Sequence, residues 1–300
     1  MSSAGYLLTP ELHDALAARI GAGVARNSLR PIAGGSISRA LRLAGTDGRQ
    51  WFVKLNEGGL AEMFAAEADG LQALAACPAL RVPAVCGYGV AGAQAYLVLA
   101  YLDLRPLREH AATAGTALAE LHRMSAANFG WRRDNFIGSS PQANTASTDW
   151  PHFFARRRLQ PQLERAARQG YAGRLLADGE RLVDALAVLF ADEQPRPSLL
   201  HGDLWSGNVA SDAAGRLVLF DPAVYFGDRE ADLAMSELFG GFPAAFYAAY
   251  RAAWPLAAGY AVRKTLYNLY HVLNHLNLFG RGYLAQAEAM IGQLLAEIKR

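Results

Sequence analysis

The segment His201-Gly202-Asp203-Leu204-Trp205-Ser206-Gly207-Asn208 places an asparagine five residues after an aspartate, and Asp221 follows the apolar run Leu217–Phe220 downstream. Phosphoryl transfer needs a carboxylate that orients and deprotonates the attacking hydroxyl, together with oxygen ligands that hold metal ions on the phosphates. The Asp203–Asn208 spacing, with an acid at the end of the next strand, is typical of a kinase catalytic loop. The sequence therefore predicts Asp203 as the base, and Asn208 and Asp221 as Mg²⁺ ligands.

The first hundred residues contain the parts of an ATP site in the expected order. Gly34-Gly35-Ser36 would cover phosphates with backbone N–H groups, although two adjacent glycines also suit a plain turn. Lys54 lies inside the apolar strand Trp51–Leu55, where an unpaired ammonium is costly. Glu67 in the following helix is its expected partner, the pair that kinases use to grip the α- and β-phosphates. The competing interpretation is a lysine on an edge strand and a solvated helical glutamate.

The stretch Ala100-Tyr101-Leu102 is expected to connect two lobes and to present main-chain groups to adenine. Before it, the strands Ala40–Ala44 and Gln50–Leu55 flank Asp47-Gly48, a strong hairpin signal. After it, apolar spacing is mainly helical, interrupted at Ser198–Phe220. We expect an α+β, two-lobed, protein-kinase-like fold, with a β-rich nucleotide-binding lobe at residues 1–100 and a helical, catalytic and substrate-binding lobe at 101–300.

Composition excludes several classes of protein. The 300 residues are 52% hydrophobic and 19% charged, enough for a sizeable core. Because 29 basic residues nearly balance 27 acidic ones, a nucleic-acid or anionic-membrane partner is not expected. No secretory signal or membrane-spanning stretch is visible, so a cytoplasmic protein is expected, by default a monomer. We expect Cys77 and Cys86 to be reduced thiols.

Three further polar residues have two interpretations each. Asp232, at a helix start, either tethers the catalytic-loop backbone or is an ordinary first-turn acid favoured by the helix dipole. His271 and His275 share one face of an apolar helix, as a metal-binding pair would. Because no third ligand is suitably spaced, the preferred interpretation is that His271 and His275 are satisfied or partly buried histidines.

Several blocks of the chain resemble the fructosamine/ketosamine 3-kinase family, which is related to aminoglycoside and choline phosphotransferases. The loop Gly202–Asn208 resembles the loop of this family and replaces the Arg-Asp-Leu-Lys of protein kinases. The other matching blocks are Leu121-His122, Asn128–Gly130, Asn135–Gly138, Pro141–Asn144, Asp149–Phe154, Arg158–Leu163, Phe220–Phe242 and Leu269–Gly280. The resemblance therefore covers nearly the whole chain.

The resemblance implies ATP-dependent phosphorylation of the sugar 3-hydroxyl of ketoamines, the adducts of reducing sugars with amines such as protein lysines. The unstable 3-phosphate then leaves and restores the amine. Trp205, which has no equivalent in protein kinases, would lie against the sugar or its amine, where cation–π attraction reaches about 2 kcal/mol. The alternative is that Trp205 packs on the following loop.

The chain departs from the family pattern at two positions. Ser36 stands where several relatives have a cysteine, so no disulfide switch is expected there. Ala100 replaces the acid common at the family's lobe connection, which leaves backbone recognition of adenine intact.

Two other functions remain open at this stage. The same catalytic residues would serve a kinase for an aminoglycoside, choline or another amino alcohol, which would differ only in Gly130–Leu163 and the C-terminal helices. A pseudokinase would bind nucleotide without catalysis, but its expected signature is the loss of a catalytic residue, and Lys54, Asp203, Asn208 and Asp221 are all present.

Overall fold

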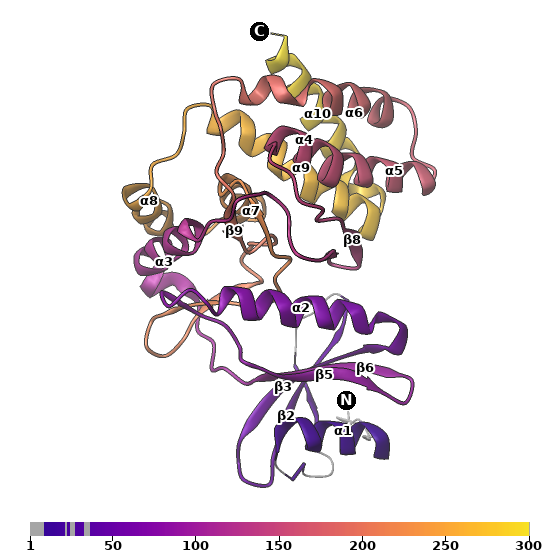
Figure 1. Ribbon diagram of the computed structural model, residues 1–300, viewed down its shortest axis with the longest axis vertical. Coiled ribbons are helices and arrows are strands. Elements are labelled where there is room, and N and C mark those ends of the chain that lie inside the picture. Colours follow the sequence, from indigo (N-terminus) through magenta and orange to yellow (C-terminus); the bar gives the residue numbers. More distant parts are fainter. Residues whose placement is uncertain (1–8, 22, 25–27, 33–36, 300) are drawn as a thin grey trace.

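The computed structural model describes residues 9–21, 23–24, 28–32 and 37–299 and has two lobes (Figure 1). The smaller lobe is built on an antiparallel five-stranded sheet of order β1-β2-β3-β6-β5. Helix α2 covers the face of this sheet that looks toward the larger lobe, and α1 lies on the opposite face (Figure 1). The bounds are α1 Pro10–Ile20, β1 Arg30–Pro31, β2 Arg39–Ala44, β3 Gln50–Glu57, α2 Ala61–Leu74, β5 Val85–Ala91 and β6 Gln94–Ala100.

The predicted hairpin forms between β2 and β3. Gly48 has a φ of 82°, which only glycine adopts at little cost, and the Asp47 side chain accepts the N–H of Arg49 at 3.0 Å. The hairpin register places Lys54 opposite Ala40 on one side and Leu97 of β6 on the other. Lys54 therefore lies on the third of five strands rather than on an edge strand, and the edge-strand interpretation is excluded.

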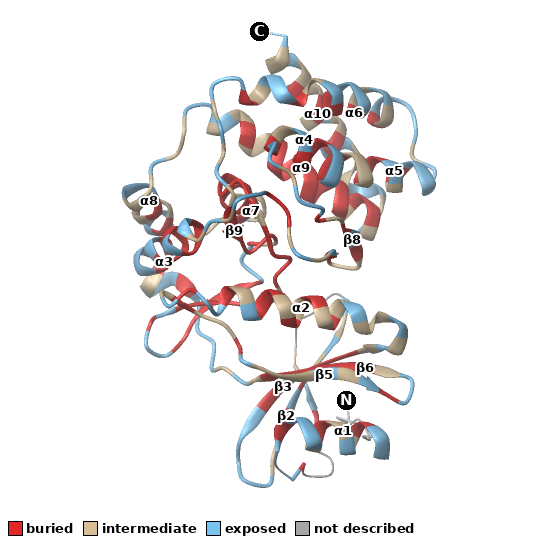
Figure 2. Ribbon diagram, in the orientation of Figure 1, coloured by how far each residue is buried: buried red, intermediate tan, exposed pale blue. Residues whose placement is uncertain are grey.

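The larger lobe is mainly helical. Its helices are η2 Leu107–His110, α3 Ala111–Arg123, α4 Trp150–Phe154, α5 Gln160–Arg168, α6 Arg174–Ala185, η4 Leu186–Phe190, α7 Glu230–Leu238, α8 Ala244–Ala253, α9 Tyr260–Phe279, η5 Arg281–Tyr283 and α10 Leu284–Ile298. The π-helical segment Ala155–Leu159 joins α4 to α5. Helix α9 runs through the middle of this lobe, and most of its residues are buried (Figure 2).

The core beside α9 is aromatic but contains a polar chain. Trp150 donates to the Tyr267 hydroxyl at 3.0 Å, and Tyr267 donates to the Asp228 carboxylate at 2.5 Å. Arg263 and Glu230 form a buried ion pair close by, with Nε 2.8 Å from Oε2. Because buried charges are tolerated only when paired and hydrogen-bonded, these contacts fix how α9 packs on the start of α7.

Short strands frame the loops that matter for function. They are β4 Leu80–Arg81, β7 Asn135–Ile137, β8 Ser140–Gln142, β9 Ser198–Leu200, β10 Val209–Ser211, β11 Leu217–Leu219 and β12 Tyr225–Gly227. Strands β10 and β11 form an antiparallel hairpin, and β12 pairs with β9. The loop that contains Asp203 therefore leaves β9 beside the loop that contains Asp221, which enters β12.

Three features of the fold were not foreseen from the sequence. Helix α1 was missed, although Thr9 accepts the Leu12 N–H as an N-cap and Pro10 occupies the first helical position. After the lobe connection, the helical stretch Leu107–Arg123 is divided into η2 and α3. The long stretch from 130 to 150 contains the β7–β8 hairpin. Among the described residues no helix combines the length and apolarity needed to cross a membrane.

A glycine sets the distance between α3 and α8. A Cβ on Gly115 would collide with the Phe246 carbonyl and approach the Tyr250 nitrogen, whereas a Cβ on Gly292 of α10 meets no neighbouring atom. We expect Gly115→Ala to lower the free energy of unfolding by about 1–3 kcal/mol through overpacking, measured by urea denaturation. The control Gly292→Ala should raise it by about 0.5–1 kcal/mol. Equal effects of the two variants would contradict close backbone packing at Gly115.

Candidate active site

Asp203 and Asn208 meet within the loop that leaves β9. The Asn208 amide donates to the Asp203 carbonyl at 2.9 Å and to Oδ2 of its carboxylate at 3.0 Å. Two backbone bonds, from Trp205 N–H to Asp203 O and from Asn208 N–H to Trp205 O, close the loop into a compact turn. The five-residue spacing therefore places the amide against the carboxylate that it orients.

The Asp203 carboxyl is in an environment suited to a general base. Burial, and secondly the nearby Asp221 carboxylate, raise the pKa of Asp203 to about 7. A base is most effective when its pKa lies near the working pH, because it is then both deprotonated and strongly basic enough to take a proton. The geometry leaves Oδ1 of Asp203 without a protein hydrogen-bond partner among the described residues.

Lys54 joins the two lobes through two carboxylates. Its ammonium lies 2.7 Å from Oε1 of Glu67 on α2 and 2.6 Å from Oδ1 of Asp221. Burial alone would lower the pKa of Lys54, but Asp221 and Glu67 raise it above its usual value, so the lysine is charged. The predicted Lys54–Glu67 pair is confirmed as a contact, and the contact with Asp221 was not predicted.

Asp221 has a strained backbone. Its φ of 56° makes it the one residue other than glycine with positive φ in the described part of the chain. Such a conformation persists only where its surroundings enforce it. The neighbouring contacts do so: the Phe220 N–H donates to the Asn208 carbonyl, and the Ala223 N–H donates to the His201 carbonyl at 2.9 Å.

The donor atoms present fit a magnesium ion. The Asn208 amide nitrogen is engaged with Asp203, and its Oδ1 has no hydrogen-bond partner among the described residues. Asp221 uses Oδ1 for Lys54, which leaves Oδ2 available on a side chain that is 39% exposed. An amide oxygen and a carboxylate oxygen are the hard ligands that Mg²⁺ takes together with phosphate oxygens and water.

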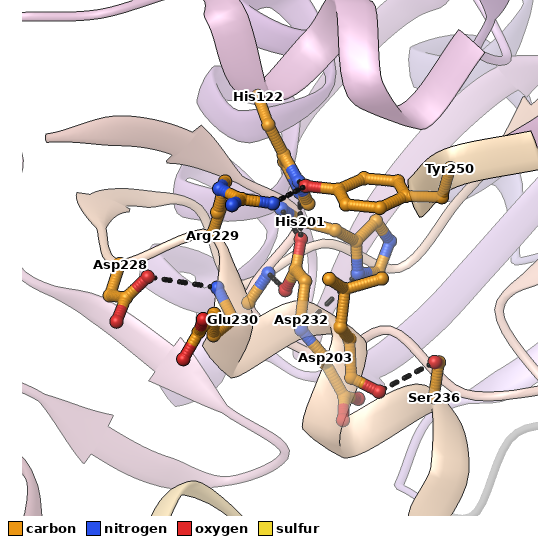
Figure 3. A network of polar contacts seen from close by, with 11 residues as sticks. His122, His201, Asp203, Asp228, Arg229, Glu230, Asp232, Ser236 and Tyr250 are labelled. Atoms are coloured by element: carbon orange, nitrogen blue, oxygen red, sulfur yellow. Dashed lines mark hydrogen bonds and ion pairs between the residues drawn. The ribbon is translucent and has the colours of Figure 1, made fainter. Parts of the chain in front are cut away.

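Asp232 holds the backbone of the catalytic loop. Its Oδ2 accepts the N–H of His201 at 2.7 Å, and its Oδ1 accepts the N–H of Gly202 at 2.9 Å (Figure 3). The residue is 1% exposed. Burial would raise the pKa of Asp232, but hydrogen bonds from His122 and the loop keep it below its usual value. The tether interpretation is thereby confirmed, and the ordinary first-turn acid is excluded.

Asp232 also belongs to a buried chain of hydrogen bonds that was not predicted from the sequence. His122 of α3 contacts Oδ2 of Asp232 through Nε2 at 3.2 Å and the Tyr250 hydroxyl through Nδ1 at 2.8 Å (Figure 3). Burial lowers the pKa of His122, so a neutral ring that donates from Nε2 and accepts at Nδ1 satisfies both contacts. The Tyr250 hydroxyl in turn accepts from Arg229 at 3.2 Å.

His201 supports both loops rather than the reaction itself. Its Nε2 bonds to the Phe220 carbonyl at 2.9 Å, and its Nδ1 accepts the Asp203 N–H at 3.2 Å. Burial lowers the pKa of His201, so its ring is neutral. The backbone between His201 and Asp203 also requires glycine at position 202. Gly202 has a φ of 82°, and a Cβ there would collide with the Ala223 carbonyl.

The segment from 130 to 150 packs against the Asp221 loop. Asn135 donates to the Val224 carbonyl at 2.7 Å, and Gln142 donates to the Ala223 carbonyl at 3.2 Å. Tyr270 of α9 donates to Gln142 at 2.7 Å. This long connection therefore supports the turn after Asp221.

The same segment also contacts the small lobe. The Trp131 indole donates to Asp69 of α2 at 2.6 Å, and Arg132 binds the same carboxylate. Arg133 pairs with Glu62 at 2.7 Å. We call these three contacts the lobe clamp, because they join the helix that carries Glu67 to the larger lobe.

The connection between the lobes has an open N–H donor at Leu102. The N–H of Ala100 bonds to the Ala84 carbonyl at 2.8 Å, and that of Tyr101 bonds weakly to the Gln50 carbonyl at 3.4 Å. The N–H of Leu102 donates to no described residue. Of the three residues predicted for adenine, Leu102 thus has the free donor. Gly34, Gly35 and Ser36 lie outside the described residues.

Trp205 is partly exposed in the loop that contains Asp203. Its indole lies over Gly207, where a Cβ would collide with the ring, and it makes an edge contact with Phe239 at 6.3 Å between centroids. The side chain remains 37% exposed. The indole therefore packs on its own loop and still presents a surface to solvent.

This architecture defines a class of protein. It has the site of a kinase-like phosphotransferase. That site combines a lysine on the sheet paired with a glutamate on a helix, a loop that contains Asp203 and Asn208, and an aspartate after a strand.

The chain belongs to the fructosamine kinase family, whose model matches residues 9–297. A probable ketoamine kinase of Synechocystis is 48% identical, with 89% of this chain and 90% of the relative aligned. A chloroplastic protein-ribulosamine 3-kinase of Arabidopsis thaliana is 40% identical over 89% of this chain and 82% of its own. The crystal structure of a candidate fructosamine-3-kinase from Thermobifida fusca has a TM-score of 0.86 and 33% identity, covering 96% of this chain and 99% of that one.

The Asp232 tether can be tested with an isosteric change. In Asp232→Asn only one amide oxygen faces the two loop N–H groups, so a buried donor loses its partner. We expect the free energy of unfolding to fall by about 3 kcal/mol in urea denaturation. Turnover should fall by about 10²-fold, as displacement of a catalytic loop commonly causes.

The matched control is Asp178→Asn on α6. Asp178 is paired with Arg181 at 2.9 Å on the surface, so its substitution should cost at most about 1 kcal/mol and leave turnover unchanged. Equal stability of the two variants would contradict the tether.

Proposed function

We propose that this protein is an ATP- and Mg²⁺-dependent ketosamine 3-kinase, which phosphorylates the sugar 3-hydroxyl of ribulosamine or fructosamine adducts on amines or protein lysines. The observation that carries the proposal is a single site in which Asn208 is hydrogen-bonded to the Asp203 carboxylate and Lys54 is paired with both Glu67 and Asp221. The relatives named as ketoamine kinase and protein-ribulosamine 3-kinase, aligned over nearly nine tenths of the chain, support this substrate class.

Each residue has one role in the proposed reaction. Asp203 orients the acceptor hydroxyl and takes its proton as the oxygen attacks the γ-phosphorus of ATP, whose bond to the β,γ-bridging oxygen breaks so that ADP leaves. Lys54, held by Glu67, contacts the α- and β-phosphates. Leu102 N–H donates to adenine. The residues that would hold Mg²⁺ are Asn208 and Asp221, and the ion would neutralise charge on the phosphate oxygens.

The Lys54–Asp221 contact has a consequence for nucleotide binding. Lys54 occupies one oxygen of the carboxylate that is proposed to bind the metal. With Asp221 engaged as a Mg²⁺ ligand, phosphate oxygens would take its place as partners of the ammonium, while Glu67 would keep the lysine in place. The lysine would thus remain paired, which avoids the cost of an isolated buried charge.

The substrate class is tested by ATP consumption with Mg²⁺ on ribulosyl-lysine, fructosyl-lysine, choline and kanamycin. We expect turnover of the ketoamines only, with the phosphate on the 3-hydroxyl as shown by phosphorus NMR. Turnover of choline or kanamycin alone would favour the alternative, a kinase for an amino alcohol or aminoglycoside. Retention of nucleotide binding without turnover of any acceptor would favour a pseudokinase.

The catalytic base is tested with Asp203→Asn. This change keeps the size of the side chain but removes its ability to take a proton, so we expect turnover to fall by about 10²–10⁴. Nucleotide affinity, measured by calorimetry with a non-hydrolysable ATP analogue and Mg²⁺, should stay within a few-fold of wild type.

A contrasting variant, Asp221→Asn, serves as control. It weakens the proposed metal site, so Mg²⁺-dependent nucleotide affinity should fall together with turnover. Wild-type turnover in Asp203→Asn would remove Asp203 from the mechanism, and unchanged nucleotide affinity in Asp221→Asn would remove Asp221 from the metal site.

A further inference from the structure

A fully buried arginine lies in the π-helical segment between α4 and α5. Arg158 is 0% exposed, and its guanidinium lies 4.0 Å from the centroid of the Tyr225 ring. Its Nη atoms donate to two backbone carbonyls and to Oδ1 of Asn144, and among the described residues no carboxylate pairs with it. Because a buried cation without a counter-ion is costly, its presence calls for a structural reason.

Arg158 begins a chain of hydrogen bonds that ends on the backbone after Asp221. Its Nη2 donates to Oδ1 of Asn144 at 2.7 Å, and Nδ2 of Asn144 donates to Oδ1 of Asn135 at 2.8 Å. Nδ2 of Asn135 then donates to the Val224 carbonyl at 2.7 Å. We call Arg158, Asn144 and Asn135 the donor chain. All three side chains are buried.

Arg158 imposes one direction on the donor chain. A guanidinium has only donors, so Asn144 must present its oxygen to it and its nitrogen to Asn135. Asn135 must then present its own oxygen to Asn144, which directs its nitrogen at the Val224 carbonyl. The Arg133 carbonyl, which accepts from Asn144 at 3.1 Å, supports the same orientation over a longer distance.

A second branch reaches the same turn without a direction of its own. Tyr270 donates to Gln142 at 2.7 Å, and Gln142 donates to Oδ1 of Asn135 at 2.8 Å and to the Ala223 carbonyl at 3.2 Å. A tyrosine hydroxyl can donate or accept, so this branch suits either orientation of the amides. Among these side chains, Arg158 is the one that can only donate.

The turn that the donor chain meets is the one that holds Asp221. The φ of 56° at Asp221 persists only because its surroundings enforce it. The Ala223 N–H is held by the His201 carbonyl at 2.9 Å, and the Val224 carbonyl is held by Asn135. If the Asn135 amide turned over, two oxygens would face one another at Val224, and the turn would lose this support.

We propose that Arg158 is a positioning residue for the Mg²⁺ ligand Asp221. By orienting the amides of Asn144 and Asn135, it keeps the turn after Asp221 in the shape that directs the carboxylate at the metal. This inference rests on the proposed function, in which Asp221 binds Mg²⁺, and adds to it a residue from another part of the larger lobe.

The test uses Arg158→Gln, because an amide both donates and accepts and so no longer imposes a direction. The affinity for a non-hydrolysable ATP analogue is measured by calorimetry, once with Mg²⁺ and once with EDTA. We expect the ratio of the two affinities to fall about tenfold, as misplacement of a ligand commonly causes, and the affinity in EDTA to stay within a few-fold of wild type. Loss of the positive charge alone would raise the ratio, since a cation repels Mg²⁺.

A double variant tests whether Arg158 acts through Asn135. Asn135→Leu removes the last donor and should lower the ratio about as much as Arg158→Gln. In the Asn135→Leu background, Arg158→Gln should then change the ratio by less than about twofold, because the two residues belong to one chain. If Arg158→Gln does not fold, Asn144→Ala, which interrupts the chain in its middle, takes its place with the same expected loss.

The control is Leu182→Ala on α6, which leaves a cavity in the same lobe and lowers stability without touching the donor chain. It should leave the ratio unchanged. An unchanged or higher ratio in Arg158→Gln, an equal fall in Leu182→Ala, or independent effects in the double variant would overturn the inference. If Asp221→Asn lowers the ratio while Arg158→Gln does not, the proposed function stands and the inference alone fails. An unchanged ratio in Asp221→Asn would overturn both.

Discussion

The site depends on one buried carboxylate that accepts backbone hydrogen bonds. Asp232 takes the N–H groups of His201 and Gly202, and so fixes where the chain turns before Asp203. Through His122 the same carboxylate is joined to α3, and through Tyr250 to α8. Three helices and the catalytic loop thus share a small polar network. Because each member is buried, a loss at one position leaves its partners without hydrogen bonds, which is costlier than the bond itself.

A second constraint operates between the lobes. Lys54 belongs to the sheet of the small lobe, whereas Asp221 belongs to a loop of the larger one, and their charges are 2.6 Å apart. Glu67 on α2 completes the triad. The contact of Lys54 with Asp221 is therefore made between the lobes, whereas the contacts of Asp203 with Asn208 lie entirely within the larger lobe. The two parts of the candidate site are thus positioned by different parts of the fold.

The sequence predicted residues whose roles depend on local spacing. Asp203 and Asn208 lie five residues apart in a single loop, and Lys54 and Glu67 lie on consecutive elements, so pattern alone brings them together. The residues it missed are brought together only by tertiary packing. His122 and Tyr250 are far apart in sequence, and neither type is typical of a kinase motif. Every residue has a backbone carbonyl, so the sequence does not show that the carbonyl of Phe220 accepts a hydrogen bond from His201. The two interpretations of Asp232 could be separated only by its burial and by the N–H groups that point at it.

The lobe clamp bears on how such an enzyme is controlled. In protein kinases the helix that carries the paired glutamate is a common point of regulation, because moving it breaks the lysine–glutamate pair. Here Trp131, Arg132 and Arg133 of the larger lobe hold that helix at Asp69 and Glu62. Displacing it would break these contacts together with the pair itself. The lobe clamp therefore ties the position of α2, and with it the lysine–glutamate pair, to the larger lobe.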